Sequence, residues 1–209
     1  MSVPYAPPRI SVGLVAAPEV SAGILNNFYE VFSFVGQGWE MLTGNPGSRR
    51  SMVPRIVAEG REAFRNPAGL TVVPDLSFDE ALRCDVVIVP DLSVPFGDSL
   101  TGRWPAAVDW LRRQHGQGAL VCSVCTGALM LAEAGLLDGV EATCHWAATD
   151  HFHRYYPRVN LRPERLLVPG GPEHRVVTTG GPASWSELAL YLVARFCGED
   201  EARRIAKVF

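Results

Sequence analysis

Short apolar runs alternate with amphipathic stretches along most of this chain. The amphipathic stretches repeat apolar residues at helical spacing and predict helices over Ala22–Val35, Trp104–His115, Ala147–Tyr156 and Ser184–Phe196. The apolar runs are short and rich in β-branched residues, which indicates buried strands over Arg9–Ala16, Val53–Glu59, Cys84–Val89, Ala119–Val124, Val140–His145, Leu166–Val168 and Val176–Thr179. This alternation predicts an α/β fold whose mostly parallel sheet is covered by helices on both faces.

Three shorter segments are assigned from local signals. Trp39–Thr43 is a candidate strand, and the Asn-Pro-Gly core of Gly44–Arg50 indicates an exposed loop. Ser77–Arg83 is predicted to be a short helix, because Ser77 and Glu80 stand at capping-box spacing. With no internal repeat or linker, residues 1–209 are expected to form one domain.

The predicted strand Ala119–Val124 runs directly into Cys125, and good helix formers follow from Thr126 onward. A strand that turns at once into a helix holds its junction residue in strained backbone, as in a nucleophile elbow, and a small residue such as Gly127 lets the two elements approach closely. The N–H groups and positive dipole end of the first helical turn favour a thiolate. Cys125 is therefore a candidate nucleophile; the alternative is a buried, inert thiol.

Ligands of open parallel sheets bind beyond the carboxyl ends of the strands, where the strand order reverses. We expect three segments to meet there, namely Pro90–Ser93, Cys125–Gly127, and His145 with Trp146. Cys125 and His145 could form a thiolate–imidazolium pair, the activation device of cysteine nucleophiles. The alternative role for His145 is that of a hydrogen-bonded core residue.

Two further motifs carry weaker signals. Cys122 and Cys125 form a C-x-x-C pair, with Cys144 beside a histidine, but a redox pair normally opens a helix and a zinc site needs more ligands. We therefore expect free thiols, no metal and no cofactor. The Gly-Gly-Pro turn that contains Gly181 precedes the last long helix and is expected to line the pocket.

Composition limits the partners of the chain. Its 209 residues carry a net charge of −3, which argues against nucleic-acid binding by this segment because phosphate recognition needs a basic face. No apolar run reaches the roughly 20 residues of a membrane span, and the amino terminus lacks a signal-peptide pattern. An odd number of cysteines, five, fits a reducing compartment. We expect a cytoplasmic protein without a membrane partner.

The motifs together carry a family resemblance. They are Ser-Val-Cys-Thr-Gly at 123–127, Leu-Ala-Glu-Ala-Gly-Leu-Leu-Asp-Gly at 131–139 and Ala-Thr-Cys-His-Trp at 142–146. In them the chain resembles the ThiJ/PfpI superfamily, with its class I glutamine amidotransferase-like fold, and more narrowly the amino-terminal domain of GlxA-type AraC-family transcriptional regulators and the related isonitrile hydratases. The resemblance implies a flavodoxin-like three-layer sandwich, a nucleophile elbow at Cys125 with His145 beside it, and a homodimer.

Two positions depart from the pattern of the family. Ile24 stands where the hydratases and many relatives carry a carboxylate that hydrogen-bonds the cysteine, and Asp91 with Leu92 replaces the frequent Gly-Gly after the preceding strand. Loss of a general acid or base typically removes a factor of roughly 10² to 10⁴ in rate, which disfavours isonitrile hydration. Asp91 could substitute for the missing acid; a capping or solvent-facing role is the alternative.

The carboxy-terminal segment Glu199–Phe209 has a helical pattern, with acids first and bases last, and no stop signal. We expect the chain to continue into another domain, and the resemblance implies a helix-turn-helix domain that binds DNA; a natural single-domain end is the alternative. Three functions follow as hypotheses: a sensor domain that binds an unidentified small molecule, a cysteine-dependent hydratase or amidase, and a thiol redox sensor. Besides Cys125 and His145, the candidate ligand-binding residues are Asp91, Leu92, Thr126, Gly127, Trp146 and Gly181.

Overall fold

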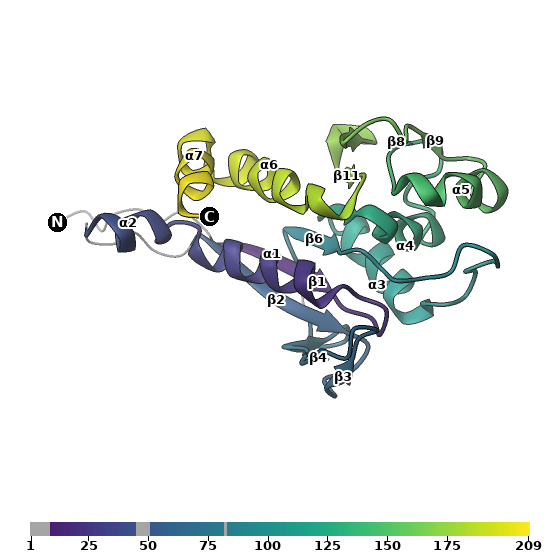
Figure 1. Cartoon of the computed structure of the whole chain (residues 1–209), viewed down its shortest axis with the longest axis horizontal. Helices are drawn as coiled ribbons and strands as arrows, with labels where there is room; N and C mark the ends of the chain where they lie inside the picture. The colour runs from purple at the N-terminus through teal and green to yellow at the C-terminus, as the bar shows by residue number, and fades with distance from the viewer. Residues whose placement is uncertain (1–8, 45–50, 82) are drawn as a thin grey trace.

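A computed structural model describes residues 9–44, 51–81 and 83–209, and its centre is a seven-stranded sheet of order β10-β11-β7-β6-β1-β2-β5 (Figure 1). Neighbouring strands are parallel except the antiparallel pair β10 and β11. The strands are β1 (Ile10–Val15), β2 (Met52–Ala58), β5 (Leu76–Ser77), β6 (Val86–Val89), β7 (Leu120–Val124), β10 (Leu167–Gly170) and β11 (Val176–Thr179). The mostly parallel sheet predicted from the apolar runs is confirmed.

Helices cover both faces of this sheet. The helices of the described residues are α1 (Ala22–Phe34), α2 (Gly38–Thr43), α3 (Pro105–Gly116), α4 (Ala128–Glu133), α5 (Thr149–Tyr155), α6 (Trp185–Cys197) and α7 (Glu199–Val208). Of these, α1, α3 and α4 pack directly on strands of the sheet. The crossover through α1 leads from β1 to β2, whereas the crossover through α3 runs in the opposite direction, from β6 to β7, so right-handed connections place α1 and α3 on opposite faces. Helix α6 packs on α1, and α4 packs on α3. The resulting three layers match the expected flavodoxin-like sandwich.

The strand order reverses between β1 and β6, because the chain first moves outward from β1 to β2 and β5 and then returns to the other side of β1. All residues of β6 and β7 are buried, as expected for central strands covered on both faces. The carboxyl ends of β1, β6 and β7 therefore lie next to one another at one edge of the sheet. This edge is where an open parallel sheet binds its ligands.

The predicted strand Val140–His145 is wrong in length and in place. Only β8 (Glu141–Ala142) is a strand, and it pairs with β9 (Asn160–Leu161) outside the main sheet. After Ala142, hydrogen bonds that involve threonine hydroxyls replace the backbone pairing of a strand. The Thr143 N–H donates to the Thr178 hydroxyl at 2.7 Å, and the Thr143 hydroxyl donates to the Arg165 carbonyl at 2.8 Å. The segment before His145 is thus tied to the sheet by threonine side chains.

The candidate strand Trp39–Thr43 is also wrong, because this segment forms α2 (Figure 1). Helix α2 packs on α7, where Arg204 lies 3.8 Å from Glu40 and the Lys207 ammonium lies 5.6 Å from the centre of the Trp39 ring. A partner distant in sequence therefore decides the conformation of this short segment.

The described part of the predicted helix Ser77–Arg83 is not helical, although its capping-box contacts form, and Leu82 lies outside the described residues. The Ser77 N–H donates to Glu80 at 2.9 Å, and the Glu80 N–H donates to the Ser77 hydroxyl at 3.3 Å. Ser77 belongs to β5 and residues 78–80 form a turn. Positions 45–50 of the predicted Gly44–Arg50 loop lie outside the described residues. A two-stranded hairpin, β3 (Phe64–Arg65) with β4 (Thr71–Val72), lies between β2 and β5 in the chain.

Candidate functional site

Cys125 occupies a strained junction between β7 and the helix that follows. Its φ angle is 58°, in the left-handed region that non-glycine residues rarely adopt, whereas Val124 before it is extended with φ −114°. A short 3-10 turn, η1 (Cys125–Gly127), leads directly into α4. The backbone thus has the conformation of a nucleophile elbow, as the sequence pattern predicts.

Gly127 permits the close contact on which this turn depends. A Cβ placed on Gly127 would collide with the backbone carbonyls of Val89 and Pro90 at the end of β6. Because both obstacles are backbone atoms, no side-chain rotation can relieve the collision. The small residue expected after the elbow is therefore required because the end of the neighbouring strand β6 approaches Gly127 so closely.

Thr126 joins the elbow to the loop after β6. The Leu92 N–H donates to Thr126 Oγ1 at 2.7 Å, and the same hydroxyl donates to the Leu92 carbonyl at 2.7 Å. Thr126 is 6% exposed and Leu92 is 2% exposed, so both bonds are shielded from water. The two predicted ligand-binding residues, Leu92 and Thr126, therefore hydrogen-bond each other and hold the loop after β6 against the elbow.

Burial governs the chemistry of the Cys125 thiol. The residue is 4% exposed, and this burial raises the pKa of Cys125 to about 11. The Thr126 N–H acts in the opposite direction, as expected at the start of a helical turn, while the Asp91 carboxylate raises the pKa further. The direction of this shift favours the alternative considered from the sequence, a buried neutral thiol, over a thiolate near pH 7.

Asp91 is the acidic group of this site. Burial raises the pKa of Asp91, and a side-chain hydrogen bond from Ser21 and the nearby His145 oppose that increase. One carboxylate oxygen, Oδ1, is buried without a hydrogen-bond partner among the described residues. Because His145 acts electrostatically on Asp91, and Asp91 acts on Cys125, Asp91 lies in the neighbourhood of both residues.

His145 makes a local contact in place of the expected pair with Cys125. Its Nδ1 accepts the Ala147 N–H at 3.3 Å and caps the short turn η2 (Trp146–Ala148). No hydrogen bond or ion pair joins His145 to Cys125 in the described part of the chain. The ring of His145 lies 5.4 Å from that of Trp146, which is 75% exposed. The histidine and the cysteine share Asp91 as a neighbour without forming the predicted pair.

The remaining predicted positions lie at the margins of the site. Gly181 begins the turn η4 (Pro182–Ser184) after β11, and a Cβ there would meet nothing within 4 Å, so it faces open space. Ile24 is buried in the first turns of α1 and brings no carboxylate. All five cysteines carry free thiols, and among the described residues no group of three potential metal ligands occurs.

Ser21 is a site residue that the sequence reasoning missed, and Cys144, which was considered there only as a zinc or redox candidate, also lies at the site. Ser21 donates its N–H to the Asp91 carbonyl at 3.0 Å, in addition to its side-chain hydrogen bond. The sequence signal for Ser21 was its position directly before α1, because serine is common at the N-cap of a helix. Cys144 is 1% exposed and donates its thiol to the His145 carbonyl at 3.2 Å; burial, and then the charge of Cys125, raise the pKa of Cys144.

Comparison with known proteins places the chain among relatives of more than one activity. The HTH-type transcriptional regulator CdhR of Pseudomonas aeruginosa is 34% identical over 141 residues, which cover 68% of this chain and 40% of the regulator. Isonitrile hydratase of Pseudomonas putida is 32% identical over 139 residues, which cover 66% of this chain and 56% of the hydratase. This chain thus spans less than two thirds of the length of either relative.

A solved AraC family transcriptional regulator from Pseudomonas putida has a similar fold, with a TM-score of 0.73 at 18% identity over 95% of this chain and 98% of that one. In sequence, residues 41–195 match the model of the DJ-1/PfpI family, a range that contains the elbow, Asp91 and His145. Since this match covers most of the chain, the protein belongs to the DJ-1/PfpI family.

Proposed function

We propose that this chain is the ligand-sensing and dimerisation domain of an AraC-type transcriptional regulator. The match to CdhR carries the proposal, because the aligned region is less than half of a protein named as an HTH-type regulator. In this proposal DNA is bound by a separate carboxy-terminal domain, since the net charge of −3 disfavours DNA binding by this segment. The protein acts in the cytoplasm as a homodimer.

The chemistry around Cys125 supports binding over catalysis. The thiol is buried and its pKa is raised, the nearby His145 accepts the Ala147 N–H, and Ile24 supplies no acid. An unidentified small molecule would act on this edge of the sheet through Asp91, Leu92, Thr126, Gly127, Trp146 and Gly181. Leu92 and Thr126 transmit its effect, because their mutual bonds fix the loop on the elbow.

DNase protection tests the proposal on the product of the complete reading frame that contains this chain. The probe is the DNA upstream of the gene and of its neighbours, with and without a library of small metabolites. We expect protection of a defined site that changes with at least one metabolite, and sedimentation as a dimer. Failure to protect any of this DNA would contradict the proposal.

A cysteine-dependent hydratase or amidase is the second candidate, favoured by the similarity to isonitrile hydratase and by the elbow backbone at Cys125. Turnover of an isonitrile or amide panel by the wild type, lost in Cys125→Ser, would support it over the regulator. The thiol redox sensor is less well supported, because a raised thiol pKa slows oxidation. Under that alternative, mild peroxide would oxidise Cys125 before the other four cysteines.

A further inference from the structure

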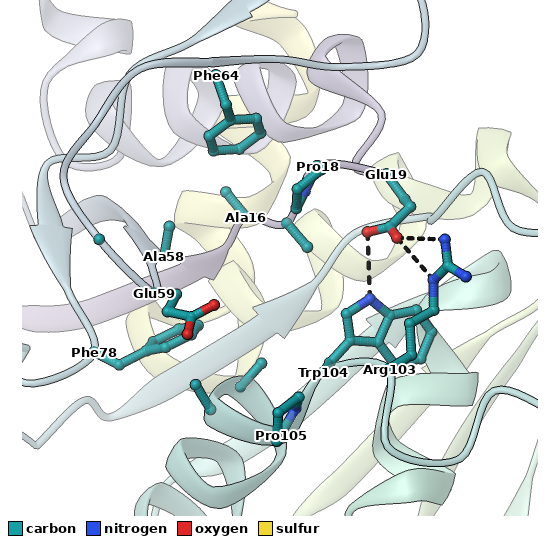
Figure 2. A pocket seen from close by; sticks show the side chains of 14 residues that line it. Ala16, Pro18, Glu19, Ala58, Glu59, Phe64, Phe78, Arg103, Trp104 and Pro105 are labelled. Carbon is teal, nitrogen blue, oxygen red and sulfur yellow. Dashed lines mark hydrogen bonds and ion pairs between the residues drawn. The ribbon is translucent and has the colours of Figure 1, made fainter.

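A cavity of about 310 Å³ opens beyond the carboxyl ends of β1 and β2, against the first turn of α3 (Figure 2). Cys125 is not among the residues that line it. Its volume lies at the lower end of the range of about 300–1,000 Å³ that small-molecule sites occupy. We infer that this cavity is a binding site for a small organic monocation, an ammonium group on an apolar or aromatic body.

The charged side chains that line the cavity favour a cation as the ligand. Three charged side chains face the cavity: Glu19, Glu59 and Arg103. Arg103 is already neutralised, because its Nε donates to Glu19 Oε1 at 2.7 Å and its terminal nitrogen lies 2.7 Å from the same oxygen. The side chains of the lining therefore carry an excess of one negative charge, which belongs to Glu59 and exceeds the roughly half positive charge at the start of α3.

Glu59 is the carboxylate left for a ligand. The other oxygen of Glu19 accepts the indole N–H of Trp104 at 3.3 Å, so both oxygens of Glu19 are engaged. Glu59, in contrast, makes no hydrogen bond or ion pair with any residue that the structure describes. In Figure 2, Glu59 and the Glu19–Arg103 pair lie on opposite sides of the hollow.

Aromatic rings make the cavity suitable for an organic cation. Phe64, Phe78 and Trp104 all contribute to the lining. Phe78 is held in place by stacking on Trp110, with ring centres 5.1 Å apart, so this wall is preformed. The faces of aromatic rings attract cations, and alkyl or aryl groups pack against them. A bare metal ion is disfavoured, because it needs several oxygen ligands and Glu59 offers only one free carboxylate.

The cavity is physically connected to the elbow through the segment after β1. The carbonyl of Glu19 accepts the Ser93 N–H at 2.9 Å, and Val20 forms a β-bridge with Leu92. Leu92 in turn bonds Thr126 beside Cys125. A ligand that contacts Glu19 can therefore alter the loop over the elbow. The inference goes beyond the proposed function, because such a site could exist in a protein that binds no DNA.

Calorimetric titration of this chain with benzylammonium and tetramethylammonium, each as the chloride, tests the inference. Benzyl alcohol is the neutral counterpart of benzylammonium. We expect at least one cation to bind, benzyl alcohol to bind at least about tenfold more weakly than benzylammonium, and Glu59→Gln to weaken the cation about tenfold or more. Glu164→Gln, which removes an exposed carboxylate outside the cavity, should leave the affinity unchanged.

Three results would overturn the inference. They are no binding of either cation below about 10 mM, equal affinities for benzylammonium and benzyl alcohol, or equal affinities of the wild type and Glu59→Gln. Because Glu59 is exposed and makes no bond in the described structure, Glu59→Gln should fold normally. None of these measurements involves DNA, so their failure is separate from failure of the proposed regulator function.

Discussion

Thr126 and Leu92 bind each other twice, since one hydroxyl accepts the Leu92 N–H and donates to the Leu92 carbonyl, both at 2.7 Å. Thr126→Val keeps the shape of the side chain and removes both bonds, which leaves two buried backbone groups without partners. Each such group costs about 1–3 kcal/mol, so we expect a loss of about 2–6 kcal/mol in the free energy of unfolding. Urea denaturation followed by circular dichroism measures it.

Thr126→Ser is the matched control, because it keeps the hydroxyl and loses only a methyl group. Its expected cost is about 1 kcal/mol or less. Equal losses in the valine and serine variants would show that the hydroxyl does not hold the loop.

Gly127→Ala should be strongly destabilising, because the added Cβ would collide with the Val89 and Pro90 carbonyls. Overpacking of this kind costs about 1–3 kcal/mol, and rigid backbone obstacles favour the upper end. Gly23→Ala is the comparison, since Gly23 lies in α1 and a Cβ added there would meet nothing within 4 Å. It should be neutral or stabilising by up to about 1 kcal/mol. Similar melting temperatures for the two variants would contradict the close approach at the elbow.

The elbow could be predicted from sequence because its signals are local. An apolar strand, a cysteine and a small residue two positions later determine the backbone turn at Cys125, and the structure has φ 58° there. The protonation state of the thiol could not be predicted in the same way. It depends on burial and on Asp91, which lies 34 positions away in the chain. The Thr126 N–H lowers the pKa of the thiol as expected, but desolvation raises that pKa by more.

Contacts between distant segments also explain the errors in secondary structure. Trp39–Thr43 is too short to have a decisive periodicity, and its packing on α7 makes it helical. The strand before His145 ends early because the Thr178 hydroxyl replaces a backbone partner for Thr143. The cavity escaped prediction for the same reason, since Glu19, Glu59 and Trp104 come together only when β1, β2 and α3 are assembled.

Asp91→Asn should make the Cys125 thiol more reactive. Burial and, to a lesser extent, the Asp91 carboxylate raise the pKa of Cys125, so removal of the carboxylate lowers that pKa while burial keeps it above the ordinary value. We expect the rate of alkylation of Cys125 by iodoacetamide at pH 8.5 to rise severalfold, up to about tenfold for one pKa unit. Mass spectrometry of the Cys125 peptide after timed quenching gives the rate.

Asp98→Asn serves as the control for Asp91→Asn, because it removes an exposed carboxylate that does not act on the pKa of the Cys125 thiol. Its alkylation rate should equal that of the wild type. An unchanged rate in Asp91→Asn would mean that this carboxylate does not influence the thiol.

The raised pKa of Cys125 also predicts a loss of stability at alkaline pH. The thiol titrates near 9.0 when unfolded and near 11 when folded, so its stabilising contribution is complete below pH 9 and is lost as the pH rises to about 11. Two pKa units correspond to about 2–3 kcal/mol for this nearly buried group.

Cys125→Ala retains a β-carbon at the strained position but cannot titrate. Urea unfolding under reducing conditions should give parallel stabilities for wild type and variant from pH 7 to 8.5. Above pH 9 the wild type should lose stability more steeply, and identical slopes up to pH 11 would show that the thiol is not buried as described.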